Sequence, residues 1–199
     1  MRSNSTAKPT RQKAETPSLF FSIVQPKTEY LLIPRVSSEK RRYIPIGFIS
    51  PKEIASDSCS IVPNATLYHF GILTSSVHMA WMRAVAGRLK SDYRYSGNVV
   101  YNNFVWADAT EEQNEKISKT AQAILDARSL YPDSSLADLY DPLTMPLELL
   151  KAHKANDKAV LALYGFKPDA TEEEIVAKLM QMYAEKVKEL EQKSKEKSK

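Results

Sequence analysis

Residues 68–106 read YHFGILTSSVHMAWMRAVAGRLKSDYRYSGNVVYNNFVW, and the rest of the chain is organised around this stretch. It holds both tryptophans, and its apolar residues recur at three- and four-residue steps, at Val77, Ala80, Trp81, Ala84, Val85 and Leu89. This period predicts an amphipathic helix. Ser75 or Ser76 can cap its first turn, because a short side-chain oxygen accepts from a free backbone amide there.

The residues after Leu89 lose the helical period. Residues 90–96, KSDYRYS, alternate between polar and aromatic; Gly97-Asn98 is a turn signal, and residues 99–101 predict a strand. We therefore expect a buried helix that presents a basic and aromatic loop, a plausible surface for nucleic acid. His78 lies off the apolar stripe, so it could contact DNA or be an ordinary surface histidine.

Composition bounds the class of protein. The chain has 199 residues, of which 43% are hydrophobic and 26% charged, as in a globular protein of one or two small domains. Its single cysteine excludes an internal disulfide and a multi-cysteine zinc site. No apolar run approaches the roughly 20 residues of a membrane span, and no signal peptide is recognisable. We expect a cytoplasmic protein without membrane contact.

Charge is unevenly distributed along the chain. Residues 1–108 carry 14 basic and 7 acidic residues, whereas residues 109–199 carry 14 basic and 17 acidic residues. This asymmetry indicates that the first half faces a polyanion, although ordinary surface variation is the alternative. The acidic balance of the second half favours a bracing role rather than DNA contact.

The pattern along the chain predicts an α+β fold. Residues 1–17 are polar and aperiodic, as in a flexible arm. The following apolar runs predict short strands at residues 19–24, 30–36, 43–49 and 58–62, and a helix or strand at 67–73. Prolines in these runs indicate sheet edges, bulges or strand ends. We expect a small mixed or antiparallel sheet packed with the central helix. Residues 37–42, SSEKRR, form a basic turn that is either a solvated hairpin tip or a phosphate contact.

The second half is helical by pattern. Periodic apolar residues and stop signals predict helices at 117–128, from Ser134 or Ser135 to 140, at 146–164, and from Thr171 onward. Thr171 with Glu174 three residues later is a capping box. Residues 186–199 are almost all Lys and Glu, and we expect a frayed, charged tail.

Catalytic motifs are missing from the sequence. We find no G-x-G-x-x-G, no P-loop, and no N-P-P-aromatic tetrapeptide of the kind that holds an extruded adenine. The three histidines, at 69, 78 and 153, are not at metal-ligand spacing. We therefore expect no catalysis, cofactor or metal in this chain alone.

Several long segments resemble the carboxy-terminal end of MmeI-like single-chain type IIL restriction–modification enzymes. They are RRYIPIGFI (41–49), PNATLYHFGILTSSVHMAWMR (63–83), AGRLKSDYRYS (86–96), VVYNNF (99–104), AQAILDARSLYPDSSLADLYDPLTMP (121–146) and LLKAHKANDKAVLALYG (149–165). The resemblance covers roughly residues 18–185. It departs from the family pattern at Val105 and Ala107, where the family usually has proline.

This resemblance implies a domain organisation and a partner. Residues 18–108 would form a target recognition domain for double-stranded DNA, 109–185 a helical C-terminal domain, and 1–17 and 186–199 an arm and a tail. In the family, the nuclease and the S-adenosylmethionine-dependent adenine-N6 methyltransferase domains lie upstream. The implied partners are thus DNA and the methyltransferase domain, and the cofactor would belong to that domain.

The resemblance also implies which side chains read bases. Family specificity is set by residue pairs, which fall here at Lys90 with Asp92 and at Arg35 with Asp57; Arg94 is a third candidate for base or phosphate contact. Lys or Arg can donate to guanine, and Asp can accept from the paired cytosine, so each pair is expected to prefer guanine on the target strand. The alternative is that both pairs are surface ion pairs.

Four further arginines are candidates for phosphate contact: Arg41, Arg42, Arg83 and Arg88. Arg83 and Arg88 could equally be ion-pair partners on a helix surface. Two other functions stay open at this point. The chain could be a protein-interaction scaffold with an incidental basic face, or it could bind RNA by stacking bases on Tyr93, Tyr95 and Tyr101.

Overall fold

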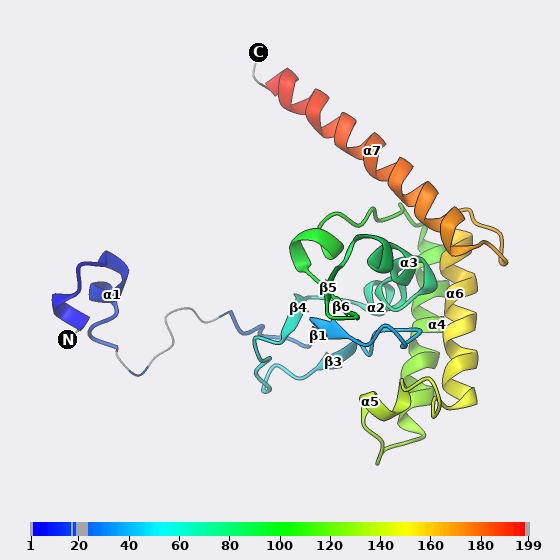
Figure 1. The fold of residues 1–199 in the computed structure, drawn as a ribbon, viewed down its shortest axis with the longest axis horizontal. Coiled ribbons are helices and arrows are strands. Elements are labelled where there is room, and N and C mark those ends of the chain that lie inside the picture. The colour runs from blue at the N-terminus through cyan, green and yellow to red at the C-terminus, as the bar shows by residue number, and fades with distance from the viewer. Residues whose placement is uncertain (1, 17, 19–23, 198–199) are drawn as a thin grey trace.

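The computed structural model describes residues 2–16, 18 and 24–197. Its first described elements are a 3₁₀ turn, η1 (Arg2–Asn4), and a short helix, α1 (Lys8–Gln12). Both lie apart from the rest of the molecule (Figure 1). The arm predicted to lack structure thus contains two helical turns, and α1 begins with Pro9 near its N-terminus, where proline's missing amide costs nothing. The strand predicted at 19–24 falls almost wholly outside the described residues.

Two small antiparallel sheets follow. The first has the strand order β3-β1-β4, formed by β1 (Tyr30–Pro34), β3 (Gly47–Ile49) and β4 (Cys59–Pro63). The second has the order β2-β6-β5, formed by β2 (Val36–Ser37), β5 (Gly87–Leu89) and β6 (Asp92–Arg94). Arg35 is the single residue between β1 and β2, so the chain passes from one sheet to the other through it.

The predicted strand at 43–49 forms only at its end. Residues 43–46 are buried but irregular, because Pro45 has no amide to donate to a ladder. The strand predicted at 99–101 is wrong. Residues Gly97–Tyr101 form a turn of π-helix, η2, with Val100 buried and its carbonyl accepting from the Trp81 indole at 2.9 Å. A short apolar run does not distinguish strand from helix by periodicity alone.

Two helices lie beneath the sheets. They are α2 (Leu67–Leu73) and α3 (Ser76–Val85), the latter capped by the Ser75 hydroxyl, which accepts from the His78 amide. Leu89 does not belong to the helical stripe: Ala86 is extended, α3 ends before it, and Leu89 is 51% exposed on β5. His78 is completely buried rather than at the surface. It therefore cannot contact DNA in this structure.

The C-terminal half is helical, as predicted. It contains α4 (Glu111–Ser129), α5 (Leu136–Leu139), α6 (Leu147–Leu163) and α7 (Glu172–Lys197). The capping box of Thr171 and Glu174 forms as expected, with the Thr171 amide donating to Glu174 at 2.8 Å. Instead of fraying at residue 186, α7 continues to Lys197 and projects away from the body (Figure 1).

The two halves share one continuous hydrophobic core. Helices α4 and α6 pack side by side, and α2 packs on α4 (Figure 1). The close approach of α2 requires Gly71, because a Cβ there would lie 2.7 Å from the Ile117 side chain. Asn156 of α6 donates to the Gly71 carbonyl at 2.7 Å, so the contact is specific as well as close.

A buried carboxylate on α6 completes the first turn of α3. Asp157 accepts from the Ser76 amide at 2.7 Å and from the Tyr43 hydroxyl at 2.6 Å. The first amides of a helix have no partner within the helix, and its N-terminus favours negative charge. Asp157 therefore ties the C-terminal helices to both the central helix and the strand region.

We expect Asp157→Ala to lower the free energy of unfolding by about 1–3 kcal/mol, because the Tyr43 hydroxyl and the Ser76 amide lose a buried acceptor. The midpoint of denaturant unfolding measures this. Asp157→Asn should cost less, since the amide oxygen still accepts from Ser76. The exposed Asp169→Ala is the matched control, and an equal effect in both alanine variants would contradict the role assigned to Asp157.

Stability should also fall between pH 6.5 and pH 5. Burial lowers the pKa of His78 and of His153 to about 3, with Arg128 and Arg42 adding to the effect at His153. Below pH 6.5 the unfolded chain therefore binds protons that the folded chain does not. The contribution of the two histidines to stability is complete above pH 6.5 and is lost as pH falls. The loss is about 1.4 kcal/mol per pH unit for each histidine. Burial raises the pKa of Asp157, which acts in the opposite direction.

Denaturant unfolding at pH 7, 6 and 5 measures this slope. The exposed carboxyls with altered pKa values, Asp138, Glu148 and Glu173, are all shifted downward, so they titrate below this window. A flat or inverted slope in the Asp157→Asn variant, which lacks the opposing carboxyl, would show that the two imidazoles are not buried as neutral groups.

Candidate nucleic-acid interface

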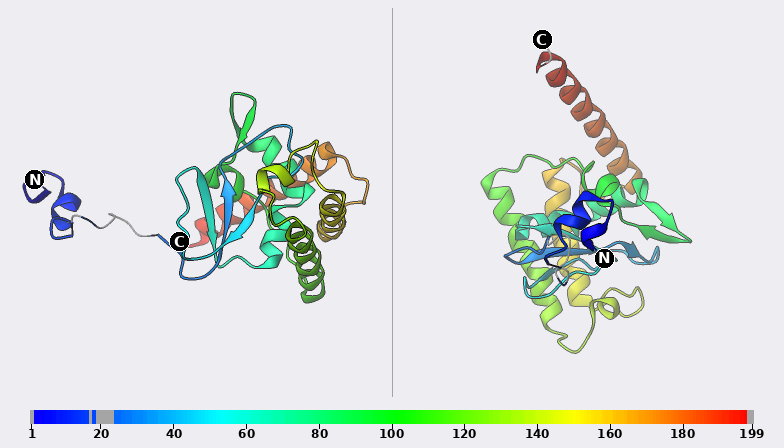
Figure 2. Two further views of the ribbon diagram at one scale, coloured as in Figure 1. Left: turned by 90° about the horizontal axis from the view of Figure 1, so that it is seen from below. Right: turned by 90° about the vertical axis from the view of Figure 1, so that its left-hand side faces the viewer.

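The hairpin of β5 and β6 carries the first predicted pair. A two-residue turn, Lys90-Ser91, joins the strands, and Leu89 pairs with Asp92 across it. Lys90 has φ +57°, a left-handed conformation in which a residue with a side chain is strained. Figure 2 shows the hairpin projecting from the body of the molecule.

The second sheet presents one face to solvent. Arg94 pairs with Gly87 on one side and Val36 on the other, and Asp92 pairs with Leu89. Since side chains alternate along a strand and align across paired strands, Val36, Leu89, Asp92 and Arg94 share this face. We call these four residues, with Lys90 at the edge, the reading face. Val36 and Leu89 are 41% and 51% exposed, aliphatic surface that the sequence analysis missed and strand alternation could have found.

The opposite face of the same sheet is anchored in the core. Tyr93 is buried there, with the Arg88 guanidinium 3.8 Å from the centre of its ring. The Tyr95 hydroxyl bonds to His78 Nε2 at 2.9 Å, and the Tyr95 amide donates to the Arg35 carbonyl at 2.7 Å. The central helix thus holds the hairpin through His78. Tyr93 and Tyr95 are not available to stack on RNA bases.

The ion-pair alternative for the first pair does not describe the structure. Within the described residues, the Lys90 ammonium and the Arg94 guanidinium have no hydrogen-bond or ion-pair partner. Asp92 is half-buried and accepts only a long bond, 3.4 Å, from the Glu39 amide. The side chains that could read a base are therefore open to a ligand.

The second predicted pair lies at a groove of about 810 Å³. Arg35 and Asp57 are both exposed and both line it, together with β4, Tyr95, Tyr101 and Asn102. The Arg35 amide donates to the Ser58 carbonyl at 2.9 Å, which holds the loop of Asp57 against the strand crossing. No ion pair forms between Arg35 and Asp57 among the described residues. Arg35 adjoins β2, so this groove borders the reading face.

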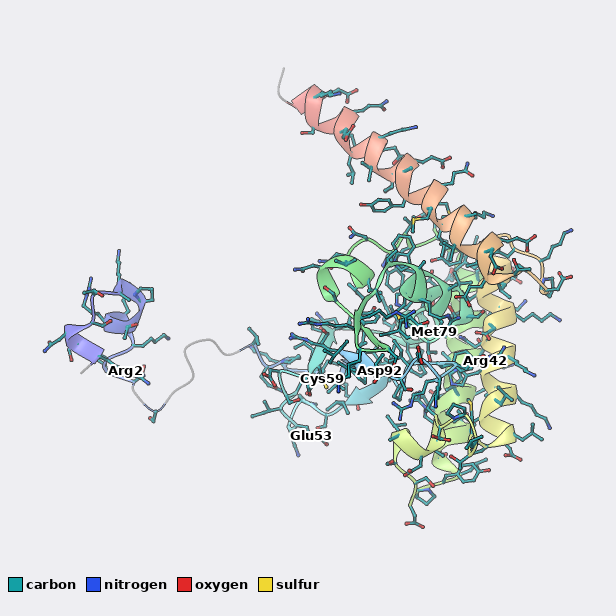
Figure 3. The ribbon with its side chains drawn as sticks, in the orientation of Figure 1. Arg2, Arg42, Glu53, Cys59, Met79 and Asp92 are labelled. Carbon is teal, nitrogen blue, oxygen red and sulfur yellow. The ribbon has the colours of Figure 1, made fainter. Side chains whose placement is uncertain are left out.

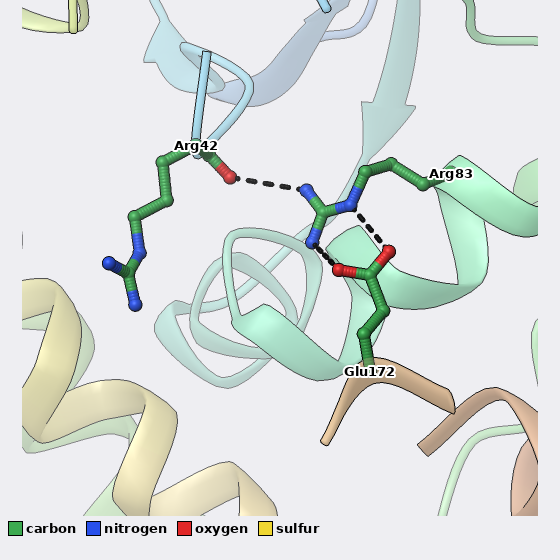
Figure 4. A network of polar contacts seen from close by, with 3 residues as sticks. All are labelled: Arg42, Arg83 and Glu172. Atoms are coloured by element: carbon green, nitrogen blue, oxygen red, sulfur yellow. Dashed lines mark hydrogen bonds and ion pairs between the residues drawn. The ribbon is translucent and has the colours of Figure 1, made fainter. Parts of the chain in front are cut away.

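The four predicted phosphate contacts separate into two groups. Arg83 binds Glu172 with two bonds, of 2.7 and 2.8 Å, and donates to the Arg42 carbonyl (Figure 4). Arg88 lies over Tyr93 and 3.8 Å from Glu39. Both arginines therefore form ion pairs, Arg83 from helix α3 as the alternative expected and Arg88 from strand β5 rather than from a helix surface.

The other two arginines are less engaged. Arg41 makes a 3.4 Å bond to the Ala137 carbonyl and is half-buried. Arg42 is exposed, and its guanidinium lies apart from the Arg83–Glu172 pair (Figure 4). Of the four, Arg41 and Arg42 form no ion pair among the described residues, and Arg42 is the exposed one of these two.

The exit from the first half is ordered without the family's prolines. The Tyr164 hydroxyl donates to the Val105 carbonyl at 3.0 Å, and the Tyr68 hydroxyl donates to the Ala107 carbonyl at 3.3 Å. Trp106 packs between His69 and Phe104. Two tyrosines and one tryptophan thus hold this segment.

Other kinds of site are not evident in the described part of the chain. No group of three or more His, Cys, Asp or Glu side chains is arranged to hold a metal ion. None of the described helices is long and apolar enough to cross a membrane.

Comparison with known protein families identifies the family of this chain. Residues 1–108 match the family described as MmeI, target recognition domain, and residues 109–191 match MmeI, C-terminal domain. The chain therefore belongs to the MmeI family and comprises these two domains of it.

Two relatives are informative. The solved structure of the type IIL restriction–modification enzyme MmeI in complex with DNA is 53% identical, with a TM-score of 0.83 over 92% of this chain and 25% of that one. DNA methyltransferase A of Bacillus subtilis (strain 168) is 39% identical over 184 residues, which are 92% of this chain and 21% of that protein. The chain spans about a quarter or less of the length of either relative.

We expect Lys90→Gly to preserve or raise the stability of the fold. Glycine adopts the left-handed conformation without strain, a gain of about 1 kcal/mol, and the Lys90 side chain has no partner to lose. Thermal unfolding of the variant and the wild type measures the change. Lys119→Gly within α4 is the contrasting control and should destabilise, because glycine weakens a helix interior. A clear loss of stability in Lys90→Gly would mean that the Lys90 side chain has a structural role.

Proposed function

We propose that this chain recognises a specific sequence in double-stranded DNA, as the target recognition part of an S-adenosylmethionine-dependent DNA adenine-N6 methyltransferase of the restriction–modification type. Membership of the MmeI family supports the class of function. The observation that carries the proposal is the reading face, where Lys90, Asp92 and Arg94 are held on a rigid hairpin and are not paired with one another.

The chemistry of this face suits the edge of a base pair. A lysine or arginine donates to O6 and N7 of guanine, and a carboxylate accepts from the N4 amine of cytosine. A cation with a nearby carboxylate can therefore read one G·C pair across both strands and fix its orientation. Each such contact contributes roughly 1–3 kcal/mol of discrimination. Arg35 and Asp57 would read a second pair from the neighbouring groove.

The shared core gives the two domains different roles in this proposal. The C-terminal helices brace the recognition hairpin through Asp157, Asn156 and the α2–α4 contact. Methyl transfer would belong to a methyltransferase domain, which would bind S-adenosylmethionine and be this chain's protein partner. In this proposal the chain itself needs no cofactor, and its DNA substrate implies a cytoplasmic location.

A charge exchange tests the proposal. Lys90→Glu with Asp92→Arg should move the preferred base at one position from G to C, because the donor and the acceptor exchange places. Selection of bound duplexes from a randomised pool, followed by sequencing, measures the preference. The control exchanges charges on α4, with Lys119→Glu and Glu115→Arg, and should leave the selected sequence unchanged.

Two outcomes would count against the proposal. If the exchange leaves the selected sequence as in the wild type, Lys90 and Asp92 do not read a base. If the wild type retains no duplex at low salt, the chain is not a DNA-binding module, and the protein-interaction scaffold would then be the better account.

A further inference from the structure

A second charged surface lies beside the reading face, between the two domains. It is a groove of about 740 Å³ formed by the loop after β2, helices α3 and α6, and the start of α7. Six basic and three acidic residues line it. Four of the basic residues define what we call the cationic groove: Lys40, Arg42, Lys154 and Lys158.

The acidic residues of this groove are largely neutralised by local contacts. Glu172 is held by both bonds from Arg83 (Figure 4). Asp157 faces inward, bonded to Tyr43 and Ser76, and burial raises its pKa. The third, Glu39, is shared with Arg88 at 3.8 Å. Arg83 and Arg88 thus suppress negative charge near the groove rather than binding phosphate themselves.

The four cations, in contrast, form no ion pair among the described residues. All four are exposed, and the ammonium groups of Lys40, Lys154 and Lys158 have no hydrogen-bond or ion-pair partner within the described residues. The Arg42 guanidinium is more engaged, because it lies 5.6 Å from the centre of the Tyr43 ring and interacts with the Tyr43 hydroxyl and the Asp157 carboxylate. Lys154 and Lys158 are four residues apart on α6, so they lie on one side of the helix, about 6 Å apart along its axis. A surface of this kind attracts an extended anion.

The groove is continuous with the recognition hairpin. Glu39 lines the groove, and its amide donates to Asp92 of the reading face. The loop after β2 and the β5–β6 hairpin lie side by side in both views of Figure 2. Figure 3 shows Arg42 near the α4–α6 pair and Asp92 in the hairpin. A duplex whose bases meet the hairpin would therefore bring its sugar–phosphate backbone toward these cations.

We propose that the cationic groove binds the DNA backbone, and that Lys154 and Lys158 bring the C-terminal domain into direct contact with phosphate. This inference rests on the proposed function. Contacts to phosphate position a protein on the duplex but carry no sequence information. The groove thus supplies affinity and register, and the reading face supplies specificity. The overall acidity of the second half does not oppose this, because the charge that acts on a phosphate is the local one.

Salt dependence of binding tests the groove. Lys154→Ala with Lys158→Ala should flatten the plot of log K against log salt by about 1.8 units, since each phosphate contact contributes roughly 0.9. Fluorescence anisotropy with a target duplex and a random duplex, between about 50 and 200 mM salt, measures the slope. The effect should be the same for both duplexes. The control variant, Lys116→Ala with Lys119→Ala on α4, removes the same charge away from the groove and should change neither slope.

Lysine acetylation of the unaltered chain gives an independent measurement. Duplex DNA should protect Lys40, Lys154 and Lys158 from the reagent and leave Lys116 and Lys119 reactive. Polyglutamate, in a parallel sample, tests an acidic polypeptide as the occupant. Protection by polyglutamate but not by DNA would overturn the inference.

The remaining outcomes separate this inference from the proposed function. If DNA protects Lys90 but none of the groove lysines, and the groove variant keeps the wild-type slope, the groove is not a backbone site and the reading face stands. If DNA protects no lysine and the wild type shows no salt-dependent binding, both proposals fail.

Discussion

The structure depends on a carboxylate that one domain inserts into the other. Asp157 on α6 accepts from the first turn of α3 and from Tyr43, while the adjacent Asn156 bonds to the Gly71 carbonyl. A buried donor without an acceptor is costly, so these hydrogen bonds fix the position of one half of the chain relative to the other. Gly71 allows this arrangement, since any larger residue would hold α2 away from α4.

This arrangement determines how rigidly the reading face is held. The core runs from α6 and α4 through α2 and α3 to His78, and from His78 through Tyr95 to the strand crossing at Arg35. A hairpin on a mobile support would lose discrimination, because base-edge hydrogen bonds require fixed donor and acceptor positions. Buried polar residues, among them His78, which the sequence analysis allowed as a surface residue, therefore keep the exposed ones in place.

Helix caps and apolar runs in the sequence predicted correctly those elements whose formation depends on neighbouring residues. Ser75, Thr171 and Ser135 cap helices as their sequence positions indicate, and the strands at 30–34 and 59–63 follow their apolar runs. Two of the predictions that were wrong, the strand at 99–101 and the exposed His78, concern residues whose state is set by distant partners. Val100 is held by Trp81, and His78 by Tyr95 and Phe104. The base-reading assignments stay predictions.

By itself, the sequence determined the α+β class, the helical second half and the family, because these follow from short-range patterns and long matching segments. The tertiary structure alone decided which charges are free. Arg83 and Lys154 cannot be distinguished by spacing, yet Arg83 is paired with Glu172 from 89 residues further along the chain and Lys154 faces an open groove. Pairing between distant residues is a property of the folded chain, since only packing brings such residues within bonding distance.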